Sequence, residues 1–374
     1  MEFELLDYKR STANLACSIL KEFNANPTHE TLDIADEVLA RGYDNVIVYI
    51  LDGLGMKILE KNCSEDSLFR SHVYGEYKSV FLPTTVAATT SMDSALYPSE
   101  TAWLAWDCYY PEIDKNVTVF LNTLTETNIP AADYNVARTL RPYKSVVAKI
   151  NEAGGEAYYS HPFEAPFLQT FEERADHIVE LCSKPGKKYI YAYDPQPDGS
   201  MHRYGTGAKE AKQTIAQLER KVAALCERLN ALDTSTLIIV TADHGQMDPT
   251  KYCILDYPDI MDCLVRDPSL EPRALNFFVK PECMDKFPAL FNGHFGETFK
   301  LLTHKEVIDG ELFGTGEPHE KFEGMIGDFV AVATGDAAIF FSYEAMEAHI
   351  GFHGGMTEDE MRVPLIVFEC GAVK

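Results

Sequence analysis

A chain of 374 residues is longer than one hydrophobic core usually supports, so we expect one large domain carrying an insertion, or two domains. Its formal net charge of −25, from 58 acidic and 33 basic residues, argues against a protein that holds long nucleic acids or anionic membranes nonspecifically. A small phosphate compound is compatible with this charge if a local cation reverses the field.

The amino-terminal residues and the cysteines indicate a cytoplasmic protein. Residues 1–7 are acidic and lack the basic and apolar segments of a secretory signal, and no apolar run is long enough to span a bilayer. The nine cysteines include no CxxC pair, which is typical of reduced thiols rather than of a disulfide or zinc-finger framework. We therefore predict a cytoplasmic location and no membrane partner.

The first predicted strand, residues 45–51, ends in a carboxylate. Two helical segments within residues 10–41 precede it, and its continuous apolar run is typical of a strand buried on both faces. Asp52 and Gly53 follow directly. Asp52 is thus a candidate ligand at a strand end, and a plain Asp-Gly turn is the alternative.

A second predicted strand, residues 78–82, leads into a hydroxyl-rich helix start. Thr84 and Thr85 follow Pro83 there, and a helix N-terminus favours an anion such as phosphate. The two threonines can be a cap and a nucleophile, or two ordinary caps. A threonine hydroxyl attacks only when a neighbouring base or metal activates it.

An aromatic cluster lies just beyond these threonines, in residues 102–120. It contains both tryptophans of the chain, Trp103 and Trp106, together with Tyr110. The three side chains can form a stacking wall for a base or an aromatic leaving group. The alternative is that they pack beneath a lid, because aromatic residues dominate protein cores.

Strands and helices then alternate from residue 143 to residue 231. This alternation predicts an α/β fold with a doubly wound, mostly parallel sheet and helices on both faces. The strand at 188–193 runs into a segment with two prolines and two glycines, which predicts a loop. Asp198 and His202, four residues apart in this loop, can hold one ion, and a polar surface loop is the alternative.

The predicted central strand, the apolar run of residues 237–240, leads to two more ligands. Asp243 and His244 follow it, and Gly245 lets the chain leave the pleat so that both side chains can reach one ion. Ligands of open α/β sheets gather at this carboxyl edge of the strands. A strand-ending turn that binds nothing is the alternative.

Residues 249–350 differ from the rest and predict an inserted, smaller α+β cap. They contain short isolated strands, short helices and many Gly and Pro turns. The α/β catalytic core therefore comprises residues 1–248 and 351–374. It resumes at His353, which two glycines follow, before a short helix and a last strand at 363–368.

The candidate ligands fall into two groups, each with nitrogen and oxygen donors. The first contains Asp52, Asp243, His244 and the Thr85 oxygen, and the second contains Asp198, His202 and His353. Two such sites with open positions suit a pair of zinc ions, as in two-metal catalysis.

Five motifs resemble the alkaline phosphatase superfamily, and within it the type I phosphodiesterase/nucleotide pyrophosphatase family. They occur in the family's order across nearly the whole chain. The motifs are Val46 to Gly55 with Asp52, Phe81 to Thr85, Asp198 to His202, Ala242 to Gly245, and His353 to Leu365.

The resemblance implies an alkaline phosphatase-like fold and a dizinc hydrolase with Thr85 as its nucleophile. Thr85 would attack a small phosphodiester or pyrophosphate and form a phosphothreonine, which hydroxide then releases. Ala88, three residues after Thr85, carries no group that can donate to a phosphoryl oxygen, which leaves the nucleotide preference open.

Four other functions remain open beside the phosphodiesterase. A phosphomonoesterase or a phosphonate hydrolase of the same superfamily is one class, and a phosphomutase, typically with serine and Mn²⁺, is another. The non-enzyme alternative is a metal-stabilised protein that binds a phosphate ligand. The sequence does not predict the leaving group or the oligomeric state.

Overall fold

The computed structural model describes residues 6–371. Residues 1–5, on which the prediction of no secretory signal partly rests, lie outside this range. Within it, none of the helices combines the length and the apolarity needed to cross a bilayer.

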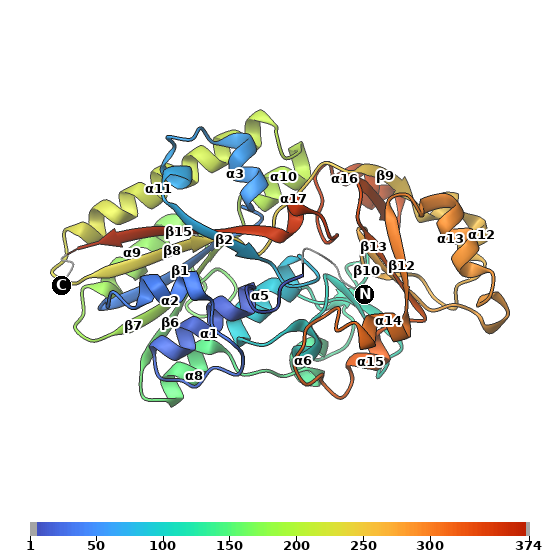
Figure 1. Ribbon diagram of the computed structural model, residues 1–374, viewed down its shortest axis with the longest axis horizontal. Coiled ribbons are helices and arrows are strands. Elements are labelled where there is room, and N and C mark those ends of the chain that lie inside the picture. Colours follow the sequence, from blue (N-terminus) through green and yellow to red (C-terminus); the bar gives the residue numbers. More distant parts are fainter. Residues whose placement is uncertain (1–5, 372–374) are drawn as a thin grey trace.

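A six-stranded sheet forms the centre of the larger part of the molecule (Figure 1). Only β15 runs antiparallel to its neighbours, so the sheet is mostly parallel, as predicted. The strands β1, β8 and β7 in its middle are completely buried, which explains their continuous apolar runs. In order across the sheet the strands are β2 (Val73–Lys78), β15 (Arg362–Cys370), β8 (Thr236–Thr241), β1 (Asn45–Leu51), β7 (Lys188–Asp194) and β6 (Glu156–Ser160).

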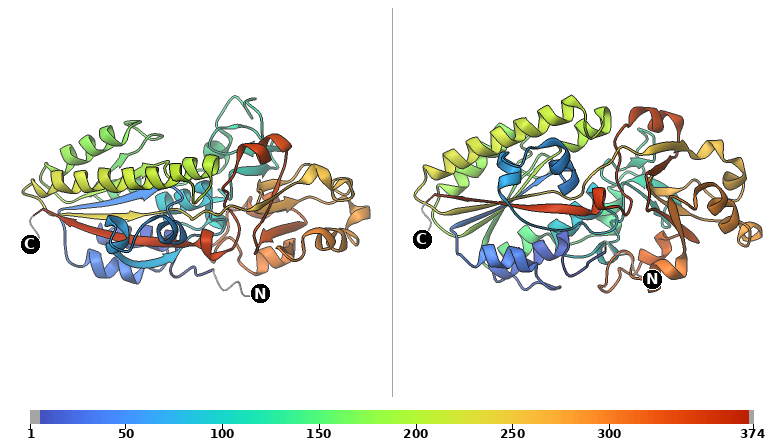
Figure 2. Two further views of the ribbon diagram at one scale, coloured as in Figure 1. Left: turned by 90° about the horizontal axis from the view of Figure 1, so that it is seen from above. Right: turned by 45° about the horizontal axis from the view of Figure 1, so that its top comes forward.

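Helices cover both faces of this sheet, which confirms the predicted layers (Figures 1 and 2). The 22-residue helix α11 (Lys209–Asn230) covers one face with an apolar stripe that includes Ile215, Val222 and Leu229. Its layer also contains α3 (Met56–Asn62), α4 (Leu68–Ser71), α9 (Phe171–Cys182) and α10 (Asp198–Tyr204). The opposite layer contains α1 (Thr12–Glu22), α2 (Asp33–Leu39), α5 (Thr85–Ser94) and α8 (Val146–Glu152).

A second, seven-stranded sheet lies at the other end of the molecule (Figure 1). Its strands, in order, are β12 (Phe299–Thr303), β13 (Phe329–Ala333), β11 (Ala274–Phe277), β10 (Ser269–Glu271), β3 (Asp107–Tyr110), β4 (Lys115–Thr118) and β5 (Thr123–Leu124). The inserted residues 249–350 therefore do not form this sheet alone. Residues 107–124 complete it, because β10 would otherwise present an unpaired edge.

Short elements surround the second sheet. The strands β9 (Thr250–Cys253) and β14 (Ala337–Phe340) pair in parallel. The helices are α6 (Pro98–Thr101), α7 (Val136–Leu140), η1 (Ile254–Asp256), α12 (Pro258–Met261), η2 (Pro281–Cys283), α13 (Phe287–Phe295), α14 (His304–Asp309), α15 (Phe322–Met325), α16 (Tyr343–Ala348) and α17 (Glu358–Met361).

The prediction of a strand at 78–82 is wrong in position. The strand β2 ends at Lys78, and the apolar residues after it run beneath α5 without sheet pairing. Val80, Phe81 and Leu82 are fully buried there. Their apolar character therefore reflects burial, which a short apolar run does not distinguish from a strand.

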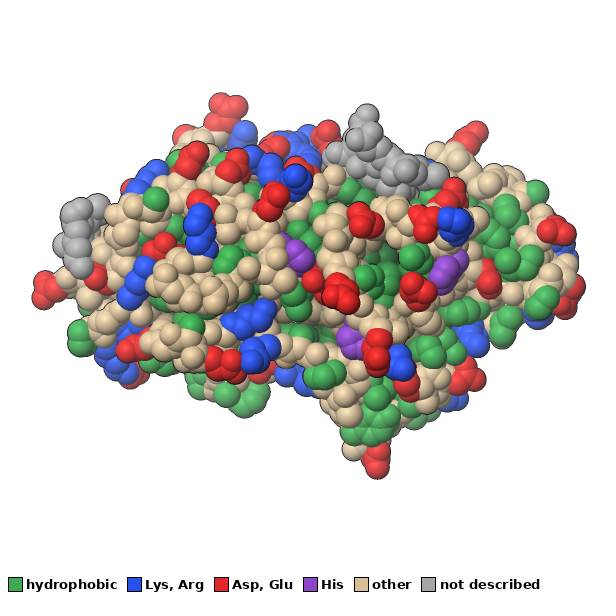
Figure 3. All heavy atoms as spheres, turned by 60° about the horizontal axis from the view of Figure 1, so that its bottom comes forward, with side chains coloured by type: hydrophobic (Ala, Val, Ile, Leu, Met, Phe, Trp, Pro, Cys, Tyr) green, Lys and Arg blue, Asp and Glu red, His purple; other side chains and the backbone are tan. Residues whose placement is uncertain are grey.

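Acidic and basic side chains are interspersed on the face drawn in Figure 3. That face of the described residues shows no continuous basic area. The visible surface therefore offers no extended cationic track of the kind that long nucleic acids require.

Candidate active site

Neighbouring strands of the central sheet deliver the candidate ligands to one edge. The parallel strand β1 lies between β8 and β7, so the carboxyl ends of all three strands lie side by side. Asp52 follows β1, Asp243 and His244 follow β8, and Asp198 begins α10 just after β7. The sheet topology thus brings together residues that lie far apart in the sequence.

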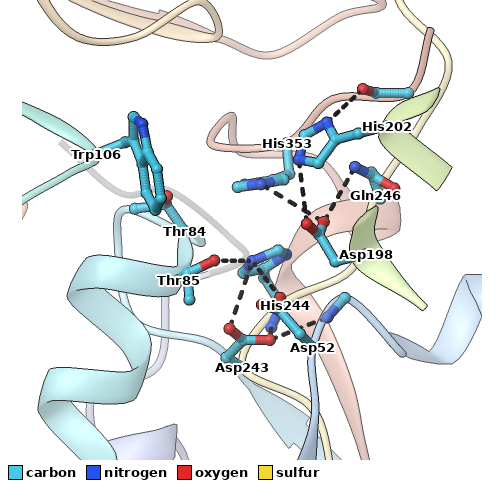
Figure 4. Close-up of polar contacts among 12 residues, drawn as sticks. Asp52, Thr84, Thr85, Trp106, Asp198, His202, Asp243, His244, Gln246 and His353 are labelled. Carbon is cyan, nitrogen blue, oxygen red and sulfur yellow. Dashed lines mark hydrogen bonds and ion pairs between the residues drawn. The ribbon is translucent and has the colours of Figure 1, made fainter. Parts of the chain in front are cut away.

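The first group surrounds the Nε2 atom of His244 (Figure 4). This atom lies 3.4 Å from Asp52 Oδ1 and 3.5 Å from Asp243 Oδ2. The Thr85 hydroxyl lies 3.4 Å from the same nitrogen. The structure therefore brings together all four residues predicted for the first ion.

The second group surrounds the carboxylate of Asp198 (Figure 4). Its oxygens lie 3.3 Å from His202 Nε2 and 3.8 Å from His353 Nε2. Ligand atoms of Asp198, His353 and His244 also lie within 4.8 Å of one another. The two predicted groups are thus adjacent, with His244 between them.

The three histidines are held by the same kind of contact. In each ring Nδ1 faces a backbone carbonyl oxygen: Gly245 O at 2.9 Å for His244, Gly351 O at 2.8 Å for His202, and Pro83 O at 3.1 Å for His353. When Nδ1 carries the proton and donates it to a carbonyl, Nε2 is unprotonated and its lone pair is free. This is the arrangement in which proteins present histidine to a metal ion.

One oxygen of each carboxylate in the first group lacks a hydrogen-bond partner. Asp52 Oδ1 and Asp243 Oδ2 are buried and accept no hydrogen bond. Burial raises the pKa of Asp243 to about 7, and burial together with repulsion from Asp243 raises the pKa of Asp52. A dication at this position would satisfy both oxygens and remove the repulsion, so the donor set fits a metal ion.

Most of the chain matches one protein family. A family model described as type I phosphodiesterase / nucleotide pyrophosphatase matches residues 46–356. The chain belongs to this family. Its members are metal-dependent hydrolases, and the two clusters of acidic and histidine side chains are consistent with that dependence.

A known relative and several solved structures are similar to this chain. A curated relative, bis(5'-adenosyl)-triphosphatase ENPP4 from Bos taurus, is 26% identical over 98 residues, or 25% of this chain and only 22% of that protein. The murine ectonucleotide pyrophosphatase/phosphodiesterase 5 structure has a TM-score of 0.64 at 16% identity, covering 87% of this chain and 88% of that chain.

Two further structures show the same fold. An inactive variant of the murine protein in complex with AMP has a TM-score of 0.64 at 16% identity and covers 87% of each chain. The human protein has a TM-score of 0.64 at 17% identity and also covers 87% of each chain. These similarities confirm the alkaline phosphatase-like fold.

The two adjacent threonines have different surroundings in this family member. The Thr84 hydroxyl is buried and donates to Glu271 Oε1 at 2.6 Å. Thr85, the first residue of α5, is partly exposed and faces His244. The side chain of Thr84 does not cap the helix, so it leaves the N–H groups of the first turn available to another acceptor. Thr85 is therefore the hydroxyl available to a substrate.

The segment that carries Asp198 and His202 is a helix and not the predicted loop. The helix α10 begins at Asp198 and ends at Tyr204. The flanking prolines and glycines concealed this short element, because they are usually turn residues. Residues four apart lie on the same face of a helix, so Asp198 and His202 approach each other as the ligand hypothesis requires.

Two cavities meet at Thr85, with Trp106 lining both. The first has a volume of about 610 Å³ and extends from Asp52 and Thr85 along α5. The second, of about 510 Å³, lies against His202, His353 and Glu271 where the two sheets meet. The site therefore offers separate spaces for the two sides of a substrate.

The three predicted aromatic residues differ in their access to these cavities. Trp106 lines both, and Trp103 lines the first, with its indole N–H donating to Arg141 O at 2.8 Å. Tyr110 is fully buried in the core beneath the second sheet and lines neither cavity. Its position agrees with the packing alternative and not with contact to a substrate.

Three polar residues near the site carried no recognisable sequence signal. The Tyr193 hydroxyl donates to Asp52 Oδ2, and Gln246 Nε2 donates to Asp198 Oδ1 at 3.1 Å. Glu271 faces the second cavity, and burial raises its pKa to about 8. Each depends on tertiary contacts, although Tyr193 at a strand end and Gln246 just after Gly245 lie beside recognised motifs.

Ala88 packs in the protein core. It lies in a core cluster with Ala13, Val80, Ala87 and Tyr97, and it is fully buried. A longer polar side chain at this position would enter the core. The absence of a donor at Ala88 therefore does not argue against a nucleotide substrate.

Proposed function

We propose that this protein is a metal-dependent hydrolase that cleaves a small phosphodiester or pyrophosphate through a phosphothreonine on Thr85. The observation that carries the proposal is the convergence of six carboxylate and imidazole groups beside one available threonine hydroxyl. Family membership supplies the reaction class.

Two zinc ions are the proposed cofactors, with Mn²⁺ as the weaker alternative. Asp52, Asp243 and His244 would hold one ion beside Thr85, and Asp198, His202 and His353 would hold the other. Mixed nitrogen and oxygen donors with an open position suit catalytic zinc. Such ions would stabilise the negative charge that develops during phosphoryl transfer.

The chain's own groups position the reacting atoms. The Thr85 oxygen forms a bond to phosphorus as the bond to the leaving oxygen breaks, and one water molecule later cleaves the phosphothreonine and restores the hydroxyl. The first-turn N–H groups of α5 donate to the phosphoryl oxygens. Positioning and electrostatics supply most of the acceleration of such reactions.

The proposed substrate contains a nucleoside 5'-monophosphate group. One relative is named as a bis(5'-adenosyl)-triphosphatase, and a structural relative was solved in complex with AMP. In this chain, support comes from the first cavity, whose size is in the usual range for small-molecule sites and whose walls are rich in aromatic rings.

A cytoplasmic location is also proposed. It is supported by the nine cysteines, all of which are free thiols in the structure. Fractionation of cells that express the full-length natural protein tests it, and recovery of the protein outside the cytoplasm would contradict it.

The test of the mechanism is the substitution Thr85→Ala in the zinc-loaded protein. Turnover of bis(p-nitrophenyl) phosphate should fall by about 10³-fold or more, because the nucleophile is removed. Zinc content, measured by elemental analysis, should stay near that of the wild type. Thr85→Ser is the matched control and should retain part of the activity. Unchanged turnover in Thr85→Ala would overturn the mechanism.

Relative rates separate this function from its alternatives. The proposal requires faster turnover of the aryl diester than of p-nitrophenyl phosphate or phosphonoacetate. A preference for either of the latter would identify a monoesterase or a phosphonate hydrolase. Tight phosphate binding without turnover at any metal loading would identify a binding protein.

A further inference from the structure

The first cavity ends at a carboxyl group that the proposed mechanism does not use. Asp93 lines this cavity, near the carboxyl end of α5, and is half-buried. The Tyr159 hydroxyl donates to its Oδ1 at 2.7 Å, and the Tyr143 hydroxyl donates to its Oδ2 at 3.1 Å. Among the described residues, no cation forms an ion pair with it. The carboxyl is therefore held rigidly but keeps its capacity to accept further hydrogen bonds.

Helix α5 fixes the distance between this carboxyl and the nucleophile. Thr85, Thr89 and Asp93 are spaced four residues apart, and all three line the cavity. Eight residues at about 1.5 Å each separate Thr85 from Asp93 by about 12 Å along the helix. The two-carbon linker of an ethanolamine or choline phosphate is too short to cover this separation. A ribose with an attached base is long enough.

The walls between these two ends are suited to a flat aromatic group. Trp106 lines the end near Thr85, and Phe120, Phe163 and Phe167 line the outer part, where they are 42%, 61% and 60% exposed. Exposed aromatic rings around a cavity offer stacking surfaces, because each ring has an apolar face.

The charges at the far end favour a group that donates hydrogen bonds. Burial lowers the pKa of His161 to about 3, so this neighbouring ring is neutral, and Arg138 is paired with Glu164 at 2.5 Å. Burial raises the pKa of Asp93 to about 6, and the carboxyl is therefore an ionised acceptor at neutral pH. A second phosphate or a carboxylate at this end would be repelled.

We infer that Asp93 determines the base specificity of this cavity, by accepting hydrogen bonds from the N–H groups of a guanine base. This inference rests on the proposed function. A carboxylate has two oxygens side by side, and guanine presents a ring N–H beside an amino group. Adenine and cytosine present an amino group beside a ring acceptor, and uracil presents one N–H between two carbonyl acceptors, which a carboxylate repels.

The experiment measures binding of free nucleotides to the zinc-loaded wild-type protein by calorimetry. GMP should bind about 10- to 100-fold more tightly than IMP, which lacks only the amino group, because a hydrogen bond to a charged acceptor is lost. UMP should bind more weakly than GMP by at least as much. Equal affinities for GMP and IMP would overturn the inference, and this comparison requires no variant.

A matched pair of variants then assigns the preference to Asp93. Asp93→Asn should bring the ratio of the GMP and IMP affinities close to one. Asp107→Asn is the control, because Asp107 is also a buried carboxyl that accepts from two threonine hydroxyls, but it lines the second cavity and not the first. This control should keep the wild-type ratio. An Asp93→Asn protein that keeps the ratio, or an equal loss in both variants, would contradict the assignment.

The binding measurement is independent of catalysis. Failure to hydrolyse bis(p-nitrophenyl) phosphate would refute the proposed function, whereas the GMP and IMP affinities would still test the role of Asp93. Conversely, an active diesterase without base preference would refute only the role of Asp93.

Discussion

At the scale of single residues, side chains behind the candidate ligands set their orientation and charge. The Tyr193 hydroxyl donates to Asp52, and Gln246 donates to Asp198, while backbone carbonyls orient the histidines. Such outer contacts fix which atom of a ligand faces the ion. The site therefore depends on residues that are not themselves candidate metal ligands.

Tyr193→Phe tests this dependence. Removal of the hydroxyl should weaken zinc binding about 10- to 100-fold, because Asp52 loses the group that fixes its carboxylate. Competition with a chelator of known affinity measures the change. Tyr77→Phe removes a buried hydroxyl that, among the described residues, is hydrogen-bonded to Thr241 and to no candidate ligand, so it should leave zinc affinity unchanged. Equal losses in both variants would show that the effect is general and not specific to Asp52.

Asp107 should make stability depend on pH. Burial raises the pKa of Asp107 from 3.8 to about 6, so the folded protein binds a proton more tightly than the unfolded chain does. The wild type should therefore lose stability relative to Asp107→Asn as pH rises from about 4 to 6, by up to roughly 3 kcal/mol. Thermal unfolding of both metal-free proteins across this pH range measures the difference. A constant difference would show that the pKa is not raised.

At the scale of secondary-structure elements, the sequence predicted the strands that hold the ligands better than the elements between them. The apolar run at 45–51 matched β1, and the run at 237–240 lies within β8, because a strand buried on both faces requires such a run. The helix α10 and the pairing of β3 with β10 were missed. Proline and glycine concealed the first, and the second depends on a contact across more than a hundred residues, which local patterns do not encode.

The functional residues also divide into those that the sequence predicted and those that it did not. Asp52, Asp243 and His244 were recognisable because they follow predicted strands, whereas Glu271 and Asp93 lie in elements whose partners the sequence does not reveal. The choice of Thr85 over Thr84 could not come from the residues alone, since both are hydroxyls at one helix start. The family resemblance implied Thr85, and the contact of Thr84 with Glu271 supports that choice.

A buried ion pair connects the inserted unit to the short helix that follows His353. Arg273 Nε lies 2.6 Å from Glu360 Oε1, both side chains are fully buried, and Gly355 N donates to the same carboxylate at 2.7 Å. The carboxylate of Glu360 therefore fixes the glycine turn beside His353 as well as the junction between the two parts.

Glu360→Gln should destabilise the protein by about 3–5 kcal/mol, because it leaves the Arg273 guanidinium buried without a counter-charge. Chemical unfolding of the metal-free protein measures the loss. Asp309→Asn, in an exposed pair with Lys305, is the matched control and should change stability by less than about 1 kcal/mol. Similar effects in the two variants would contradict the role given to burial.

At the scale of the whole molecule, a mostly parallel sheet and an antiparallel sheet meet at one site. The mostly parallel sheet supplies the candidate ligands, and the second sheet supplies Glu271 and part of the second cavity. The chain has a formal net charge of −25, and three of its carboxylates lie together in the candidate site. Cations should therefore contribute to folding as well as to chemistry.

Removal of metal tests this contribution. A chelator should lower the thermal midpoint of the wild type, and zinc should restore it, because an ion that binds only the folded state stabilises that state. The Asp243→Asn protein should show a smaller response, since it lacks one of the two repelling carboxylates. A midpoint unchanged by chelation would contradict the proposal of resident metal ions.

The position of Trp106 between the two cavities has a consequence for how this enzyme family can diversify. The first cavity is lined by residues of the chain before the insertion, whereas the second is bordered by Phe340, Phe341 and Glu344 of the insertion. Remodelling of the insertion can thus change the second cavity and the group that it would hold, while the first cavity stays as it was. Selection can adjust the two preferences independently.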